Sequence, residues 1–179
     1  MDALAQRMLR AAKLEVSLYE EVEADRTATN QAIVVVVVSA VAAGLGAARH
    51  AGLTGLLAVT LAALAGWYVW AFLTYWIGTR LLAEPTTRSE YGELLRTIGF
   101  SSAPGVIRIL GIIPGLAGLV SLVAAVWMLV AMVIAVRQAL DYTSTWRAVG
   151  VCVVGWIVQA ILLGVVLGLL GLGLPSRPV

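Results

Sequence analysis

Charged residues are scarce in this chain. Only 12% of its 179 residues are Asp, Glu, Lys or Arg, whereas 61% are hydrophobic, and an ordinary soluble domain is charged at about a quarter of its positions. The scarcity excludes a soluble fold, because a chain of this size has too little interior to bury so much apolar surface. The twelve Lys and Arg residues are dispersed between apolar runs, so no continuous basic patch exists for binding nucleic acid.

Cysteine and histidine occur once each. Cys152 alone forms no intrachain disulfide, and its valine neighbours indicate a small buried hydrophobe. His50, next to Arg49, is expected to be an exposed turn residue, because one imidazole does not build a catalytic or metal site unaided. The sequence also lacks a phosphate loop, a nucleophile elbow, a pair of acids inside an apolar run and a polar stripe. We therefore expect no enzymatic activity, no bound metal and no cofactor.

The hydrophobic residues are gathered into runs long enough to cross a bilayer. A hydrocarbon core about 30 Å thick takes roughly 20 helical residues, and such runs lie at about 32–48, 54–77, 94–113, 116–136 and 148–172. The pattern predicts an all-α polytopic membrane protein with five transmembrane helices in one domain, 32–174, and a short tail at 175–179. We expect the third span to be kinked or broken, because Pro104 removes a backbone donor that hydrocarbon does not replace.

Residues 1–31 precede the first span and hold six of the ten acidic residues. Apolar residues recur at helical spacing over 1–23, which predicts one short amphipathic helix. Such a helix either lies in the headgroup region or packs on a partner subunit. The acidic residues of 20–25 oppose adhesion to anionic lipid, and we interpret them as a solvated turn before the first span.

Basic residues are unequally distributed between the two sides of the membrane that five crossings define. Nine lie on the side of the N-terminus and two on the other, namely Arg7, Arg10, Lys13, Arg26, Arg80, Arg88, Arg96, Arg137 and Arg147 against Arg49 and Arg177. Positive residues are retained on the cytoplasmic side. The bias predicts that the N-terminus faces the cytoplasm and that the C-terminus faces outward.

Two polar side chains within the spans are candidate functional residues. Arg108 lies in the third span, where a guanidinium is costly and marks an ion path, a lipid-headgroup contact or a subunit contact. It is near enough to the outer end to reach water or a headgroup with its long side chain, and interhelical contact and transport are the other interpretations. Gln159, in the fifth span, is expected to form a hydrogen bond with a neighbouring helix.

Small residues recur at helical spacing in three places. They are Ala58, Ala62 and Gly66 in the second span, Gly111 with Gly115 near the end of the third, and Gly164, Gly168 and Gly171 in the last. Small faces allow helix backbones to approach closely in lipid. The pattern predicts helix packing, either within the chain or between subunits.

Parts of the sequence resemble the Yip family of Ypt/Rab-interacting proteins. Residues 18–32 look like the lead-in to the first span of prokaryotic members, and 91–104 resemble the entry to the third span. Residues 127–148 are similar to the fourth span, the hinge after it and the start of the fifth span. The resemblance implies five spans after a cytoplasmic N-terminal segment. Many eukaryotic members carry Asp-Leu-Tyr-Gly-Pro, whereas here Leu18 and Tyr19 continue into Glu20 and Glu21, which argues against binding of a Rab-type GTPase.

The sequence thus favours a non-catalytic membrane protein that acts by packing. Its expected environment is the lipid bilayer, and its expected partners are other membrane-protein subunits or further copies of itself. An accessory or assembly subunit or a membrane-organising protein is the leading hypothesis, supported by the small-residue faces and the amphipathic N-terminal segment. A small transporter or channel, or a modulator of lipid or membrane shape, is the alternative, with Arg108 and the broken third span as its site.

Overall fold

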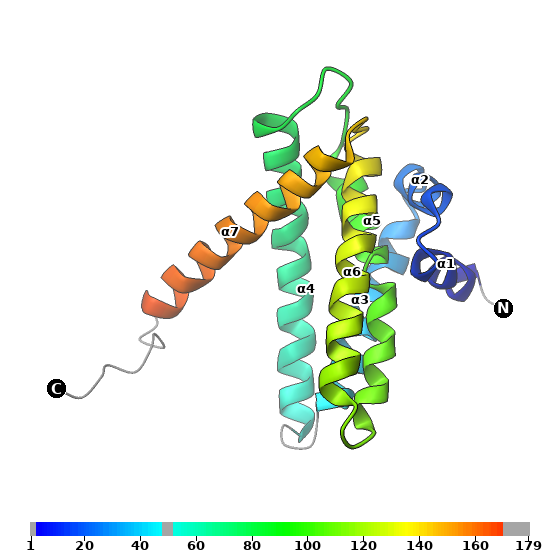
Figure 1. Ribbon diagram of the computed structural model, residues 1–179, viewed down its shortest axis with the longest axis vertical. Coiled ribbons are helices and arrows are strands. Elements are labelled where there is room, and N and C mark those ends of the chain that lie inside the picture. The colour runs from blue at the N-terminus through cyan, green and yellow to red at the C-terminus, as the bar shows by residue number, and fades with distance from the viewer. Residues whose placement is uncertain (1–2, 48–51, 170–179) are drawn as a thin grey trace.

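The computed structural model describes residues 3–47 and 52–169, and the regular elements in these ranges are all helical (Figure 1). In chain order they are α1 (Ala3–Ala12), α2 (Val16–Ala24), α3 (Ala28–Ala47), α4 (Gly52–Trp76), the π-helix η1 (Ile77–Leu81), α5 (Tyr91–Phe100), the 3-10 helix η2 (Ala103–Ile112), α6 (Ala117–Ala139) and α7 (Thr145–Leu169).

Four continuous helices in the described ranges are long and apolar enough to cross a membrane. Their qualifying segments are Ala28–Leu45, Thr54–Leu81, Ala117–Ala139 and Thr145–Leu162. The all-α polytopic fold is therefore confirmed, but the count of five transmembrane helices was not exact. The difference lies in the third predicted span, 94–113, which is not one continuous helix.

The third span is broken into α5 and η2. At the start of α5, the backbone N–H of Glu90 donates to the carboxylate of Glu93 at 2.7 Å, which closes the first turn as in a capping box. The α-helix ends at Phe100, and Pro104 stands at the beginning of η2, where its missing N–H costs no intrahelical bond. Together α5 and η2 lead from the end of the bundle where α4 finishes to the end where α6 begins (Figure 1). The broken segment therefore still spans the length of the bundle.

The N-terminal segment forms two helices, whereas the sequence predicted one over 1–23. The chain reverses at Leu14, whose φ of 62° lies in the left-handed region and ends the α-helical hydrogen bonding. A non-glycine residue at this φ is costly. The hydrophobic contacts of α1 and α2 with the bundle compensate for that cost, because Ala11, Leu18 and Val22 are fully buried in the same core as the spans.

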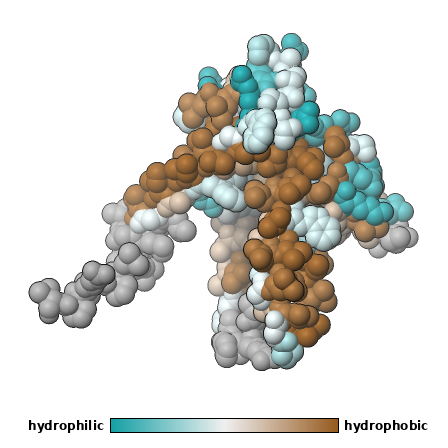
Figure 2. Space-filling view, in the orientation of Figure 1, coloured by the Kyte–Doolittle hydropathy of each residue, from teal (hydrophilic) through white to brown (hydrophobic). Residues whose placement is uncertain are grey.

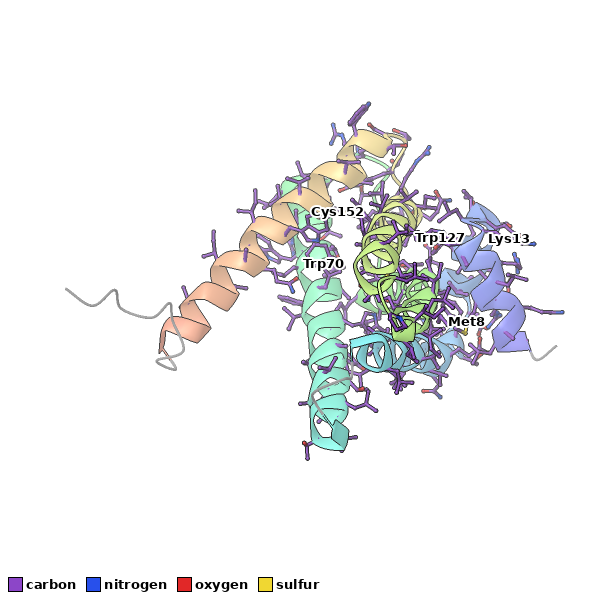
Figure 3. All side chains as sticks on the ribbon, turned by 60° about the horizontal axis from the view of Figure 1, so that its bottom comes forward. Met8, Lys13, Trp70, Trp127 and Cys152 are labelled. Carbon is purple, nitrogen blue, oxygen red and sulfur yellow. The ribbon has the colours of Figure 1, made fainter. Side chains whose placement is uncertain are left out.

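Two of the acidic residues of 20–25 hold these two helices together, so the run is not simply a solvated turn. Arg7 pairs with Glu21 at 2.8 Å and with Asp25 at 2.9 Å, and Arg10 also pairs with Glu21, at 2.5 Å. The indole N–H of Trp127, in α6, donates to the carbonyl of Ala12 at 2.8 Å and fixes the end of α1 to the bundle (Figure 3). The N-terminal arm, by which we mean α1 and α2, is thus part of the folded domain.

Helix α7 diverges from the rest of the spans. It begins beside the C-terminal end of α6 and runs obliquely away from α4 (Figure 1). Only 22% of its span residues are buried by the chain, and the corresponding share for α4 is 17%. The outward surface of α7 is strongly hydrophobic, whereas hydrophilic residues gather at the end of the bundle where α4 finishes and over the N-terminal arm (Figure 2).

Candidate functional site

A cavity of about 300 Å³ lies among the spans and brings the two predicted polar residues together. Arg108 comes from η2 and Gln159 from α7, and both line the cavity. The remaining lining is largely apolar and aromatic, supplied by every long helix as well as α5: Val36, Ser39, Ala40, Ala63, Gly66, Trp67, Trp70, Ile98, Ser102, Met128, Met132 and Trp156. We call it the Arg108 cavity.

Two aromatic side chains form the wall where α7 leaves the bundle. Gly155 is buried against the indole of Trp70, and a Cβ at this glycine would lie 3.1 Å from that ring. The close approach brings Trp156 to within 6.5 Å of Trp70, measured between ring centroids. Helix α7 touches the bundle here and diverges beyond it (Figures 1 and 3). Gln159 lies one turn further along α7 and lines the cavity.

The polar groups of the Arg108 cavity have few partners in the chain. Trp67 donates its indole N–H to the carbonyl of Leu95 at 3.1 Å. Among the described residues, by contrast, no hydrogen bond or ion pair is formed by the side chains of Arg108, Gln159 or Ser39. The interhelical hydrogen bond predicted for Gln159 is therefore not formed within this part of the chain. The cavity therefore places hydrogen-bond donors, including the cationic guanidinium of Arg108, beside an apolar wall.

The described residues of the predicted small-residue faces do not form one buried surface, and Gly66 lines the Arg108 cavity. Ala58, Ala62 and Gly164 are exposed, Gly66 and Gly111 are partly buried, and Gly115 occupies a turn with φ of +85°. A Cβ added at Gly66 or Gly164 meets nothing within 4 Å, so neither of these glycines mediates close packing within the described chain. Packing between subunits stays a prediction. The surroundings of Gly168 and the position of Gly171 fall outside the described residues.

Other glycines make the close contacts, and the sequence patterns missed them. Gly99 in α5 packs against Ala32 in α3 and against Trp67, and Gly105 in η2 packs against Ser39 and Met128. These residues hold the broken span between α3 and α6. They do not form a regular small-residue spacing, so only the three-dimensional arrangement identifies them.

Buried Arg96 links α5 to the N-terminal arm. Its Nε donates to the carbonyl of Val22 at 2.8 Å, and its Nη2 donates to the carbonyl of Glu23. Both carbonyls belong to the last turn of α2, where carbonyl groups lack intrahelical partners and a positive charge is favourable. The guanidinium therefore caps α2 and fixes it to the bundle.

A cluster of carboxylates surrounds the same end of α2. Glu20 and Glu23 from α2, Glu93 from α5 and Asp141 after α6 line one pocket. Burial, together with the charges of Glu93 and Asp141, raises the pKa of Glu23 to about 7, while Arg96 opposes the shift. Below about pH 7, Glu23 is therefore mostly protonated in the folded state.

We expect the folded protein to lose stability as the pH rises from about 5 to 8. Because the pKa of Glu23 is higher in the folded chain than its ordinary value of 4.5, its contribution is complete below that ordinary value and is lost as the pH passes about 7. Thermal unfolding in detergent at a series of pH values measures the trend, and Glu23→Gln should flatten it. Asp25→Asn is the control, because hydrogen bonds from Thr27 and Arg7 lower the pKa of Asp25 and keep it ionised throughout this range. An equal slope in Glu23→Gln and the parent would contradict the prediction.

The fold and the cavity together define a polytopic helical membrane protein. The chain belongs to the Yip family, because the family model described as the Yip1 domain matches residues 18–167. The resemblance seen in the sequence is thereby confirmed. A search of curated proteins and a search of solved structures each found no match. The family match begins inside α2, so α1 lies outside it.

Proposed function

We propose that this protein is a non-catalytic accessory or assembly subunit, or a membrane-organising protein, that binds a membrane-spanning helix of another protein along α7. The observation that carries the proposal is the divergence of α7 from its own bundle. A helix that crosses the bilayer and leaves most of its surface unused by its own chain has that surface available for a second helix. The residues Ala148–Leu169 carry no charge, so the complementary helix is apolar.

The exposed part of α7 has the chemistry of a helix-packing surface. Trp156, Ile157 and Ile161 are more than half exposed, at 54%, 56% and 61%, and Gly164 leaves open space beside them. Large side chains next to a small residue allow a second helix to interlock closely, and close packing is the main source of helix association in lipid.

The proposed setting is the inner membrane of a bacterium, with the N-terminal arm in the cytoplasm. The basic residues Arg26, Arg80, Arg88, Arg137 and Arg147 lie in or beside the connections at one end of the bundle, where the surface is hydrophilic (Figure 2). Retention of positive charge in the cytoplasm supports this orientation.

Purification in a mild detergent, followed by mass spectrometry, tests the proposal. We expect a membrane protein to co-purify in stoichiometric amount and to be lost from the Gly164→Leu variant. Gly118→Leu is the matched control, because a Cβ at Gly118 also meets nothing within 4 Å but this glycine lies at the start of α6. If the protein purifies as a homo-oligomer, the helix bound along α7 belongs to a second copy of this chain and not to another protein. A monomer without a partner would overturn the proposal.

A further inference from the structure

We infer that the Arg108 cavity binds the phosphate of an anionic phospholipid. The inference is independent of a partner for α7, because it begins from the charge of Arg108 and the residues that surround it. A guanidinium at membrane depth is costly unless an anionic group neutralises it or other groups accept its hydrogen bonds. Within 3–47 and 52–169, no side chain or carbonyl accepts a hydrogen bond from Arg108.

The described residues provide no counter-ion for Arg108. All ten acidic residues lie at positions 2, 15, 20, 21, 23, 25, 84, 90, 93 and 141, and none lies within a long apolar run. No ion pair within the described residues involves Arg108, which belongs to η2, four residues before the end of that helix at Ile112. At a rise of about 2 Å per residue, the Cα atom of Arg108 is roughly 8 Å from the end of η2.

The cavity offers the recognition chemistry of a phosphate. A guanidinium donates to two oxygens of one phosphate through its planar fork, and the side-chain amide of Gln159 and the hydroxyl of Ser39 add neutral donors. No carboxylate lines the cavity to repel an anion. The charge pattern therefore selects an anionic group over a cation or a zwitterion with an exposed ammonium.

The apolar lining favours a lipid as the source of that phosphate. Trp70, Trp156 and Met132 cover much of the wall, and such surface gains from contact with an acyl chain but not from a hydrated inorganic ion. A second groove of about 400 Å³, between α6 and α7, has a wholly apolar lining and shares Trp156 with the cavity. An acyl chain thus has an apolar path next to the phosphate-binding donors.

Quenching of tryptophan fluorescence by brominated lipid tests the assignment. The full-length protein in mild detergent is titrated with phosphatidylglycerol or phosphatidylcholine carrying brominated acyl chains. Quenching by phosphatidylglycerol should saturate at lower lipid concentration, and Arg108→Gln should weaken this binding by on the order of tenfold or more. Binding of phosphatidylcholine should change little in the variant.

Three further measurements decide between the sources of the effect. Arg88→Gln is the control, because Arg88 is exposed in the connection before α5 and its replacement should leave both lipids unaffected. Gln159→Leu should weaken phosphatidylglycerol binding by a smaller factor, which keeps the inference testable if Arg108→Gln fails to fold. The inference is overturned if Arg108→Gln and the parent bind phosphatidylglycerol equally and also bind phosphatidylcholine equally. It is also overturned if millimolar inorganic phosphate displaces the lipid, because the site would then belong to the free anion.

Discussion

The Gly99→Ala variant is expected to unfold in detergent at a clearly lower temperature than the parent protein. A Cβ at Gly99 would lie 2.7 Å from the Cβ of Ala32 and 3.3 Å from its Cα. Because the second of these atoms is backbone, a change of rotamer does not relieve the contact and α3 has to move away from α5. Overpacking of this kind costs about 1–3 kcal/mol. Thermal unfolding followed by circular dichroism measures the change.

Two companion variants separate this contact from a general effect of replacing glycine in a helix. Gly66→Ala places the same methyl group where nothing lies within 4 Å, and it should be neutral or stabilising by about 0.5–1 kcal/mol through helix propensity. Ala32→Gly removes the opposing methyl group, so the double variant Gly99→Ala with Ala32→Gly should be more stable than Gly99→Ala alone. The packing account fails if Gly99→Ala and Gly66→Ala unfold at the same temperature, or if the second substitution lowers stability further.

The long spans could be predicted because their signal is local. A run such as 116–136 has no charged residue and is bounded by Pro114 and Arg137, and hydrocarbon leaves such a run no alternative to helix. Pro104 likewise marked the break of the third span. The reversal at Leu14 could not be predicted, because leucine has no preference for a positive φ and adopts it here only when α1 and α2 both dock on the bundle.

The candidate site was predictable in part. Arg108 and Gln159 were recognisable from the sequence because polar side chains are rare within spans. Their convergence depends on the rise of η2 and on the direction of α7 beyond Gly155, and neither is encoded in a local pattern. The aromatic wall of Trp70 and Trp156 was missed for the same reason, since interfacial and cavity-lining tryptophans look alike in sequence.

Charge pairing in the N-terminal segment shows the same limit. The residues 20–25 look like a solvated acidic run when read along the chain. The reversal at Leu14 brings α1 back alongside α2, so that Arg7 and Arg10 face Glu21 and the run becomes an attachment surface. Long-range pairing of this kind requires the geometry of the turn, which the composition of the run does not contain.

The Arg96→Leu variant is expected to release the N-terminal arm from the bundle. Arg96 is only 6% exposed and donates to two carbonyls at the end of α2. Its loss leaves those carbonyls without their charged donor, and hydrogen bonds to a charged group contribute about 1.5–3 kcal/mol each. If local opening limits proteolysis, cleavage after exposed Lys13, between α1 and α2, should accelerate on the order of tenfold or more. Limited trypsin digestion of the protein in mild detergent measures the rate.

The matched control is Arg88→Leu, which removes an exposed arginine from the same end of the molecule and should leave the cleavage rate at Lys13 unchanged. Arg96→Lys keeps the charge but has one ammonium in place of the planar fork, so it should give an intermediate rate. Equal rates in Arg96→Leu and the parent would show that the arm is held without Arg96, by its apolar contacts and by hydrogen bonds such as those from Trp127 and Gln138. A faster rate confined to the Arg96 variants would instead establish that the guanidinium links the broken third span to the arm.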